Sequence, residues 1–188
     1  MADFRKRAAK AAEVLLDPDE EVLAAVNVMA SPFIAGAAMV GGAIAGGGVG
    51  AAVGAMIDGK HRNRDAGRTL PAVAARTALE PPIPANGALV AVTSKQVLMW
   101  RIGGLGKPRD ILHRFDLDIV DTFVWENADT KWLAGRPKSF LMWFGLKDVH
   151  VLSAAAIVVG PARKHAEGIV EALASRRPGI VSEFHPDT

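Results

Sequence analysis

A continuous stretch of small and apolar residues, Ala35 to Ile57, restricts the possible folds of this chain more than any other feature. It lies within a run without charged residues from Val22 to Ile57. Glycines recur in it every four residues, so a helix would carry them along one face. Helices in lipid approach one another closely through this spacing of small residues. The residues that form this expected strip for membrane or self-association are Gly42, Gly46, Gly50 and Gly54.

The alternative for the same stretch is a glycine-rich loop, because glycine costs about 1 kcal/mol relative to alanine inside a helix. Flexible linkers usually also contain polar residues such as Ser, Asn and Lys. None of these occurs between Ala35 and Ile57. The composition therefore favours a buried apolar element over a solvated linker.

The whole chain has 188 residues and a formal net charge of +2. This length suits one folded domain with an insertion, and so small a charge gives no reason to expect a nucleic-acid partner. The chain contains no cysteine, which excludes disulfides and thiol catalysis. The N-terminal residues lack the apolar core of a secretory signal. We therefore expect a cytoplasmic protein, located at the inner face of the cell membrane.

The local sequence pattern predicts the secondary structure on both sides of the apolar stretch. Ala2 to Leu16 has the spacing of a short basic amphipathic helix, which Pro18 ends. Glu21 to Val28 is expected to be the first strand. A basic cluster follows the apolar stretch and fits a membrane edge or a solvated connector. Its lipid-contact candidates are Lys60, Arg62, Arg64 and Arg68.

The second half of the chain has the alternation of strands. Two hairpins are predicted, one turning at Ser94 and Lys95 and the other at 145–148. A helix is expected from Pro161 to Arg176, with Ile169, Val170 and Leu173 facing inward. The other expected elements are a short helix over 68–79, strands over 88–93, 96–102, 111–115, 119–125, 140–144 and 149–152, a loop over 126–138 and a loose tail from Gly179.

Three phrases of the sequence resemble the bacterial PH-like (GRAM-like) proteins of actinobacteria. They are Leu15 to Val26, Ala91 to Trp100 and Gly106 to Leu112, and the resemblance extends from about Leu15 to Ser175. It implies an α+β fold, a PH-like antiparallel sheet or barrel capped by a C-terminal helix. The glycine- and alanine-rich insertion after the first strand is typical of these proteins. The superfold implies a lipid- or protein-binding module, and fold alone does not fix function.

Motifs of enzyme chemistry are incomplete in this sequence. Gly54 to Lys60 matches the start of a phosphate-binding loop, but His61 replaces the Ser or Thr that would hold magnesium. The five histidines lack metal-ligand spacing, and no serine lies in a Gly-x-Ser-x-Gly setting. Asp116 and Asp118 have strand spacing, which is commoner at a solvated junction than in a catalytic pair. We expect no enzyme activity, no metal and no cofactor.

The predicted function is that of a non-enzymatic, membrane-associated PH-like module that binds lipid or protein. Trp132, in a loop with nearby cations, is a candidate anchor at the membrane interface; folding back over the core is the alternative for this side chain. Residues 1–28 and 81–177 would form the domain, 29–80 the insertion with its basic connector, and 178–188 a tail. The alternative function is a soluble homo-oligomeric scaffold whose glycine-rich segment packs against its own copies.

Pairing of the first strand with later strands would also limit the insertion. Both of its ends would then lie on one side of a membrane, so a single span is excluded. Reversal at Gly46 to Gly48 leaves arms of about 14 residues, or roughly 21 Å. A bilayer core is about 30 Å thick. The sequence therefore predicts a shallow or re-entrant helical hairpin, or an oligomer contact.

Overall fold

The computed structural model describes residues 3–30, 76–84, 86–129, 138–147, 150–158 and 162–183. In chain order the helices are α1 (Phe4–Ala12) and α6 (Ala162–Arg176), with 3-10 turns η1 (Gly104–Gly106), η2 (Leu117–Ile119) and η3 (Pro178–Ile180). The strands are β1 (Val22–Ala30), β2 (Thr77–Ala78), β3 (Ala88–Thr93), β4 (Gln96–Ile102), β5 (Pro108–Asp116), β6 (Val120–Asp129), β7 (Lys138–Leu146), β8 (His150–Val158) and β9 (Val181–Glu183).

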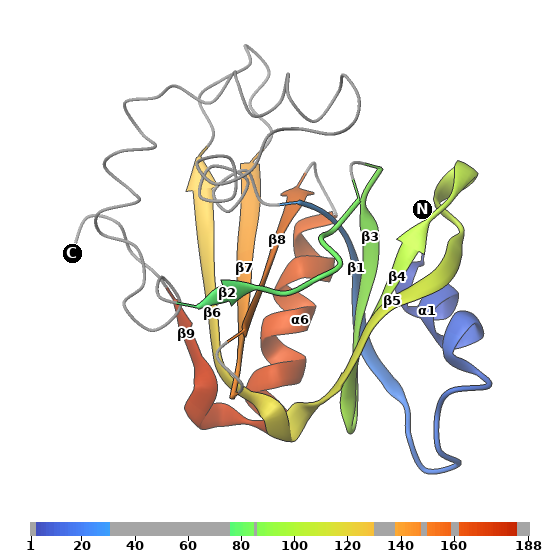
Figure 1. Cartoon of the computed structure of the whole chain (residues 1–188), viewed down its shortest axis with the longest axis horizontal. Coiled ribbons are helices and arrows are strands. Elements are labelled where there is room, and N and C mark those ends of the chain that lie inside the picture. Colours follow the sequence, from blue (N-terminus) through green and yellow to red (C-terminus); the bar gives the residue numbers. More distant parts are fainter. Residues whose placement is uncertain are drawn as a thin grey trace.

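These strands form one continuous sheet in the order β5-β4-β3-β1-β8-β7-β6-β9, with β2 also paired to β8. All the long strands pair antiparallel, whereas the two short strands, β2 and β9, pair parallel to their partners. The sheet bends at β1, whose last two residues leave β3 and pair with β8. Figure 1 shows the resulting two halves on either side of α6. The fold is α+β.

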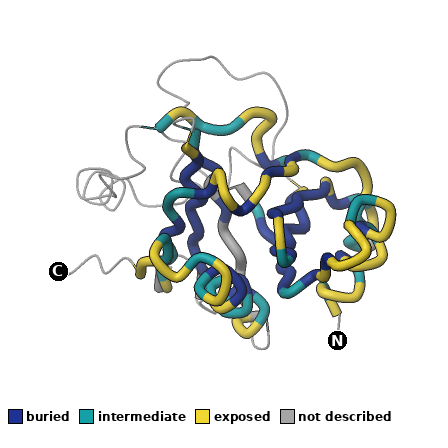
Figure 2. The backbone as a smooth tube through the Cα atoms, turned by 90° about the horizontal axis from the view of Figure 1, so that it is seen from below, coloured by how far each residue is buried: buried dark blue, intermediate teal, exposed yellow. Residues whose placement is uncertain are grey.

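The core lies between the two halves of the sheet and is completed by α6. Alternate residues of β1, β3 and β4 point into it, and Phe123, Phe140 and Phe144 fill it from the other half. Helix α6 contributes Ile169 and Leu173, both fully buried, as the sequence predicted, while Val170 is only partly buried. Figure 2 shows these buried segments facing one another, with exposed residues on the outside.

Helix α1 covers the outer face of the β1, β3 and β4 half. Asp3 caps it by accepting a hydrogen bond from the Lys6 backbone N–H at 3.0 Å. Its alanines Ala8 and Ala12 are fully buried against a layer that contains Leu89, Leu98 and Trp100. The small side chains allow the helix to lie close to the sheet, and Arg5 donates from Nε to the Val22 carbonyl at 2.7 Å.

The sequence predictions were right for most elements and wrong at several places. β5 begins at Pro108 and β8 continues to Val158, although strands over 111–115 and 149–152 were predicted. Residues 77–78 form β2 in place of the expected helix, and β6 continues to Asp129 where a loop was predicted from Glu126. The expected tail contains η3 and β9. Strands β2 and β9 are too short to have a sequence period; they are extended because β8 and β6 offer them hydrogen-bonding partners.

Both ends of the segment 31–75 are attached to the same strand. Ala30 pairs with Ala154 of β8, and Thr77 pairs with His150 of β8. These two positions on β8 are four residues apart, or about 13 Å at about 3.3 Å per residue. The predicted pairing of Val22 to Val28 with later strands is confirmed, since β1 pairs with β3 over this range.

Candidate functional site

Every site residue predicted from the sequence lies outside the described residues. This holds for the glycine strip, the basic cluster, Trp132 and the incomplete phosphate-loop string. The structure nevertheless describes the strands next to these segments, which are β1 before the apolar segment and β6 and β7 on either side of Trp132. Asp129 and Lys138, which flank the Trp132 loop, pair with each other, and Lys138 pairs with Val158 at the end of β8. The pairing of β1 with β8 places Ala30 opposite Ala154, four residues before Val158. In Figure 1 the end of β1 and the ends of β6 and β8 all lie toward the top of the view.

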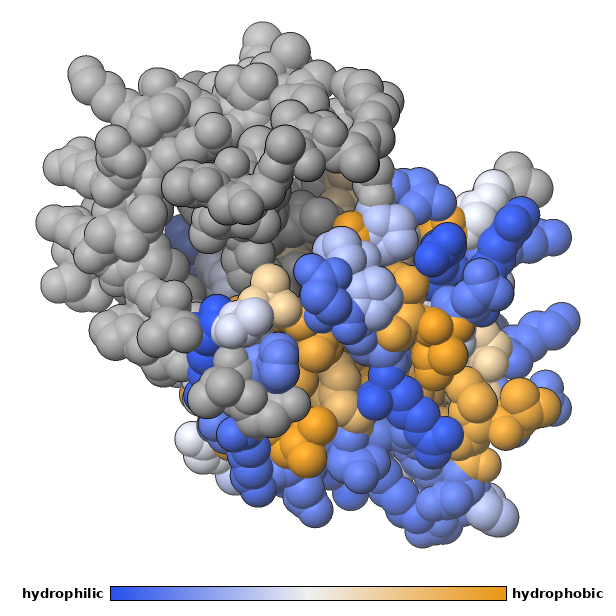
Figure 3. Space-filling model, in the orientation of Figure 1, coloured by the Kyte–Doolittle hydropathy of each residue, from blue (hydrophilic) through white to orange (hydrophobic). Residues whose placement is uncertain are grey.

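The turn between β4 and β5 lies at this end as well, because Ala88 pairs with both Val28 and Arg101. The turn carries Arg101, Lys107 and Arg109, all exposed. Arg7 of α1 joins them by donating a hydrogen bond from Nη1 to the Gly106 carbonyl at 3.3 Å. We call these four residues the cationic turn. Figure 3 shows the turn at the upper right as a hydrophilic surface.

Two glycines allow the side chains of the cationic turn to lie close to its backbone. A Cβ atom at Gly103 would lie 2.2 Å from Nε of Arg109, so any larger residue there would require the Arg109 side chain to move. Gly106 has φ of +67°, a conformation that favours glycine. Among the described residues, no carboxylate forms an ion pair with any member of the cationic turn.

An open hollow of about 350 Å³ adjoins the cationic turn. It is lined by the end of β1, by Asn86 and by the turn glycines. Asn86 is held in place because its Nδ2 donates to the Ile102 carbonyl at 2.6 Å. Asn27 Oδ1 is buried in the wall without a hydrogen-bond partner. Because this oxygen has almost no solvent-exposed area, it is not presented to a ligand in the hollow. The exposed charges of the cationic turn are the feature that favours an anionic group.

The opposite end of the domain has a buried polar network around Glu20. Thr93 donates its hydroxyl to the Glu20 carboxylate, and Gln96 Nε2 donates to both carboxylate oxygens at 2.8 and 2.9 Å. Arg114 in turn donates from Nε to Gln96 Oε1 at 2.7 Å. Gln96 is therefore oriented from both sides and connects a buried carboxylate to a guanidinium. The network attaches the loop before β1 to the β3-β4 hairpin.

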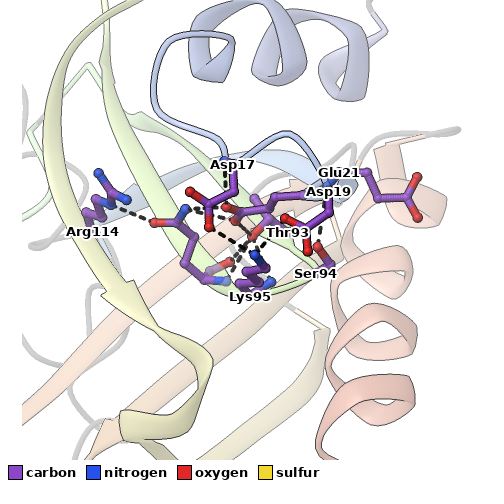
Figure 4. Close-up of polar contacts among 9 residues, drawn as sticks. Asp17, Asp19, Glu21, Thr93, Ser94, Lys95 and Arg114 are labelled. Atoms are coloured by element: carbon purple, nitrogen blue, oxygen red, sulfur yellow. Dashed lines mark hydrogen bonds and ion pairs between the residues drawn. The ribbon is translucent and has the colours of Figure 1, made fainter.

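Lys95 forms two exposed ion pairs with the same loop before β1. Its ammonium group lies 2.9 Å from Asp17 Oδ2 and 2.8 Å from Asp19 Oδ1, as Figure 4 shows. The hydrogen bonds that Lys95 donates to Asp19 and Asp17 raise the pKa of Lys95, and the bond that Asp19 accepts from Lys95 lowers the pKa of Asp19. These charges satisfy one another, so this end has fewer unpaired charges to offer a ligand.

Replacement of Gln96 by leucine tests the structural role of this network. The variant keeps the volume of the side chain but removes both donors to Glu20 and the acceptor for Arg114. We expect Gln96→Leu to lower the free energy of unfolding by about 1 to 3 kcal/mol, the cost of leaving buried polar groups unsatisfied. Urea unfolding followed by tryptophan fluorescence measures this change. Unchanged stability in Gln96→Leu would mean that Glu20 finds other donors.

No catalytic arrangement is evident within the described residues. They contain no group of three or more His, Asp and Glu side chains that could hold a metal ion. Asp116 ends β5, whereas Asp118 lies in η2 and pairs with Arg177 at 3.1 Å. The two carboxylates therefore do not share a strand face, contrary to their sequence spacing. His113 is buried, and its Nε2 lies 2.7 Å from the Pro81 carbonyl; burial lowers its pKa.

None of the helices in the described part of the chain has the length and hydropathy that crossing a bilayer requires.

Sequence reasoning missed both the cationic turn and the Glu20 network. Arg7 and Gly106 are far apart in the chain, so only the fold brings them together. Lys107 and Arg109 flank Pro108 within the phrase Gly106 to Leu112 of the family resemblance, and no local pattern marks them as a site. The phrases Asp17 to Glu21 and Thr93 to Gln96 belong to the family resemblance, and their polar residues were the available signal for the network.

No protein-family model matches the chain, and no curated protein matches it. Among solved structures, one similar chain is the hSac2 domain from the human phosphoinositide phosphatase Sac2. The two chains are 9% identical, and the match covers 96% of this chain and 87% of the other with a TM-score of 0.45. These values are too low to establish a shared fold.

Proposed function

We propose that this chain is a non-enzymatic PH-like module that associates with an anionic membrane surface through the end that carries the cationic turn. The succession of elements supports the PH-like assignment. Strands β1, β3, β4 and β5 pair in one half, β6, β7 and β8 pair in the other, and α6 follows the last long strand. This is the order of elements that the sequence resemblance implies.

The observation that carries the membrane proposal is the cationic turn without described counter-charges. Water screens the repulsion between exposed cations in a turn, so holding them near one another costs little free energy. Each of them contributes about 1 kcal/mol of binding free energy when it lies at an anionic leaflet. The adjoining hollow provides room beside the turn for part of a lipid headgroup. The charge and the shape of the surface therefore favour the end with the cationic turn as the membrane-binding end of the domain.

The apolar segment and the Trp132 loop fit the same orientation. The chain enters the segment 31–75 after Ala30, and in Figure 1 the end of β1 lies toward the same side of the view as the ends of β6 and β8. Because both anchors of the segment pair with β8, a membrane-inserted segment returns to the side from which it left. Lys60, Arg62, Arg64 and Arg68 follow the apolar run and would add charge contacts to the same leaflet.

Charge reversal at the cationic turn tests the proposal. We expect Lys107→Glu/Arg109→Glu to bind vesicles containing phosphatidylglycerol at least about 30-fold more weakly than the parent protein. The reason is the loss of two favourable charges, about 2 kcal/mol together. Co-sedimentation of the full chain with vesicles of increasing phosphatidylglycerol content measures the effect. Binding of the parent should also weaken as salt is raised.

The matched control reverses two exposed cations at the opposite end, Lys147→Glu/Arg176→Glu. This variant has the same net charge as the test variant and should bind nearly as the parent does. Equal losses in the two variants would show that only net charge matters. If the parent and both double variants fail to bind vesicles and are oligomeric without detergent, the protein is better described as a homo-oligomeric scaffold.

A further inference from the structure

Residues 76–84 form a strap that crosses from one half of the sheet to the other. Its first part lies on the half that contains β8, where Thr77 and Ala78 pair with that strand and Leu79 N–H donates to the Val151 carbonyl at 2.8 Å. Figure 1 shows β2 and the residues after it passing in front of α6 toward β3. The strap therefore covers part of the core that the two halves enclose.

The start of the strap is held by Arg76. This residue donates from Nη2 to Asp121 Oδ2 at 3.0 Å and from Nη1 to the Leu146 carbonyl at 2.6 Å. The hydrogen bond from Arg76 lowers the pKa of Asp121. The ion pair therefore stays charged throughout the pH range in which a histidine titrates.

The later part of the strap is held mainly by one hydrogen bond and one side chain. Three of its last four residues are prolines, which have no N–H to donate. The Pro81 carbonyl accepts a hydrogen bond from Nε2 of His113 on β5 at 2.7 Å, and Ile83, 6% exposed, belongs to the core cluster. Residues 80–82 are exposed. A segment with so few buried contacts opens more readily than the strands that it covers.

His113 is a buried group that can take up a proton. Burial lowers its pKa, and this effect outweighs the hydrogen bond to Pro81 and the charge of Glu80, both of which raise the pKa. Glu80 is the charged group that acts on the imidazole, whereas Met99 opposite it on β4 and Phe115 beside it on β5 are uncharged. Among the described residues, no carboxylate forms an ion pair with His113. A proton on Nδ1 therefore leaves a poorly compensated charge beneath the strap.

We propose that the strap is a pH-sensitive clip, in which protonation of His113 releases residues 80–84 from β5 and the core while Arg76 keeps the start of the strap attached. Release places the imidazolium in water and uncovers Ile83, so more apolar surface is exposed in acid than at neutral pH. Neither membrane binding nor the segment 31–75 is needed for this device.

The direction of the pH dependence follows from the two states of His113. In the closed state burial lowers the pKa of His113, whereas in the open state this pKa returns to about 6.5, the ordinary value for histidine. The open state therefore binds the proton more tightly. The closed strap has its full stability above about pH 6.5 and loses stability as the pH falls below this value.

A single cysteine measures the opening, because the chain has none of its own. In Ile83→Cys the thiol is covered while the strap is closed and reacts with a thiol reagent when the strap opens. The observed rate divided by the rate for the unfolded chain at the same pH gives the opening constant. Between pH 7.5 and 5.5 this constant should rise several-fold, up to about tenfold, the limit for one proton and an open-state pKa of about 6.5. An opening constant that does not change with pH would overturn the proposal.

Val90→Cys separates release of the strap from unfolding of the whole domain. Val90 is 0% exposed on β3, so its thiol reacts only on global unfolding. Its opening constant should be at least about tenfold smaller than that of Ile83→Cys and should rise steeply with low concentrations of urea, whereas that of Ile83→Cys should barely change. Equal constants for the two cysteines would mean that the strap is part of the cooperative core and does not act as a clip.

Substitution of His113 in the Ile83→Cys background identifies the titrating group. His113→Gln keeps an N–H donor for the Pro81 carbonyl but cannot be protonated, so its opening constant should not change between pH 7.5 and 5.5. His113→Ala lacks the donor and should open more often, again without pH dependence. The matched control Glu80→Gln removes the neighbouring charge, keeps His113 and should retain the rise in acid. A rise in acid that persists in both His113 variants would assign the effect to another group and refute the clip.

Discussion

Leu173→Ala is expected to lower the free energy of unfolding by about 2 to 5 kcal/mol, the range for a large-to-small change in a closed core. Leu173 is 0% exposed and lies one helical turn after Ile169. Helix α6 contacts β1, β3 and β8, so a cavity at this position weakens both halves of the sheet together. Chemical denaturation followed by tryptophan fluorescence measures the change.

The control for this prediction is Glu171→Ala on the same helix. Glu171 is exposed and its side chain is also shortened by the substitution, but no core volume is lost. Its free energy of unfolding should remain near that of the parent. A Leu173→Ala protein that unfolds together with this control would place α6 outside the cooperative core.

Gly87→Ala is expected to have the second largest effect. Gly87 has φ of +88°, and a Cβ added there would lie 2.6 Å from the Val28 carbonyl oxygen. The backbone conformation alone costs an alanine about 1 to 3 kcal/mol, and the clash is with main chain that cannot rotate away. Relief requires Val28 to move from its pairing with Ala88. Thermal unfolding should show a large decrease in the midpoint temperature.

Gly104→Ala is the comparison for Gly87→Ala. A Cβ at Gly104 would meet no atom within 4 Å, and this glycine does not have a left-handed conformation. Both variants add one methyl group to a glycine near the cationic turn. Equal stability of the two proteins would contradict the close approach of β1 to Gly87.

The elements predicted correctly from the sequence are those whose pattern is local. The hairpin of β3 and β4 has alternating apolar residues on both sides of Ser94 and Lys95, and its predicted bounds match the structure. The helix α6 begins just after Pro161 and ends before Pro178, where proline favours a helix start and prevents continuation. In both cases neighbouring residues contain the information.

The features that escaped prediction depend on partners distant in the chain. β9 is extended because β6 lies beside it, and nothing within Val181 to Glu183 requires a strand. Glu20 is buried because Thr93 and Gln96 supply donors from another hairpin. The cationic turn includes Arg7 only because α1 packs across the sheet. Local sequence cannot specify these pairings before the fold exists.

The attachment of both ends of the segment 31–75 to β8 has a consequence for how the chain can vary. The two ends of this segment are about 13 Å apart along β8, and they are brought together once, when β1 and β2 join the sheet. The entropy of that closure depends only on the logarithm of loop length, about 0.6 kcal/mol for each doubling. Lengthening or shortening of the segment therefore changes the stability of the sheet very little. The length of this segment is therefore free to vary while β1, β3 and β8 keep their register.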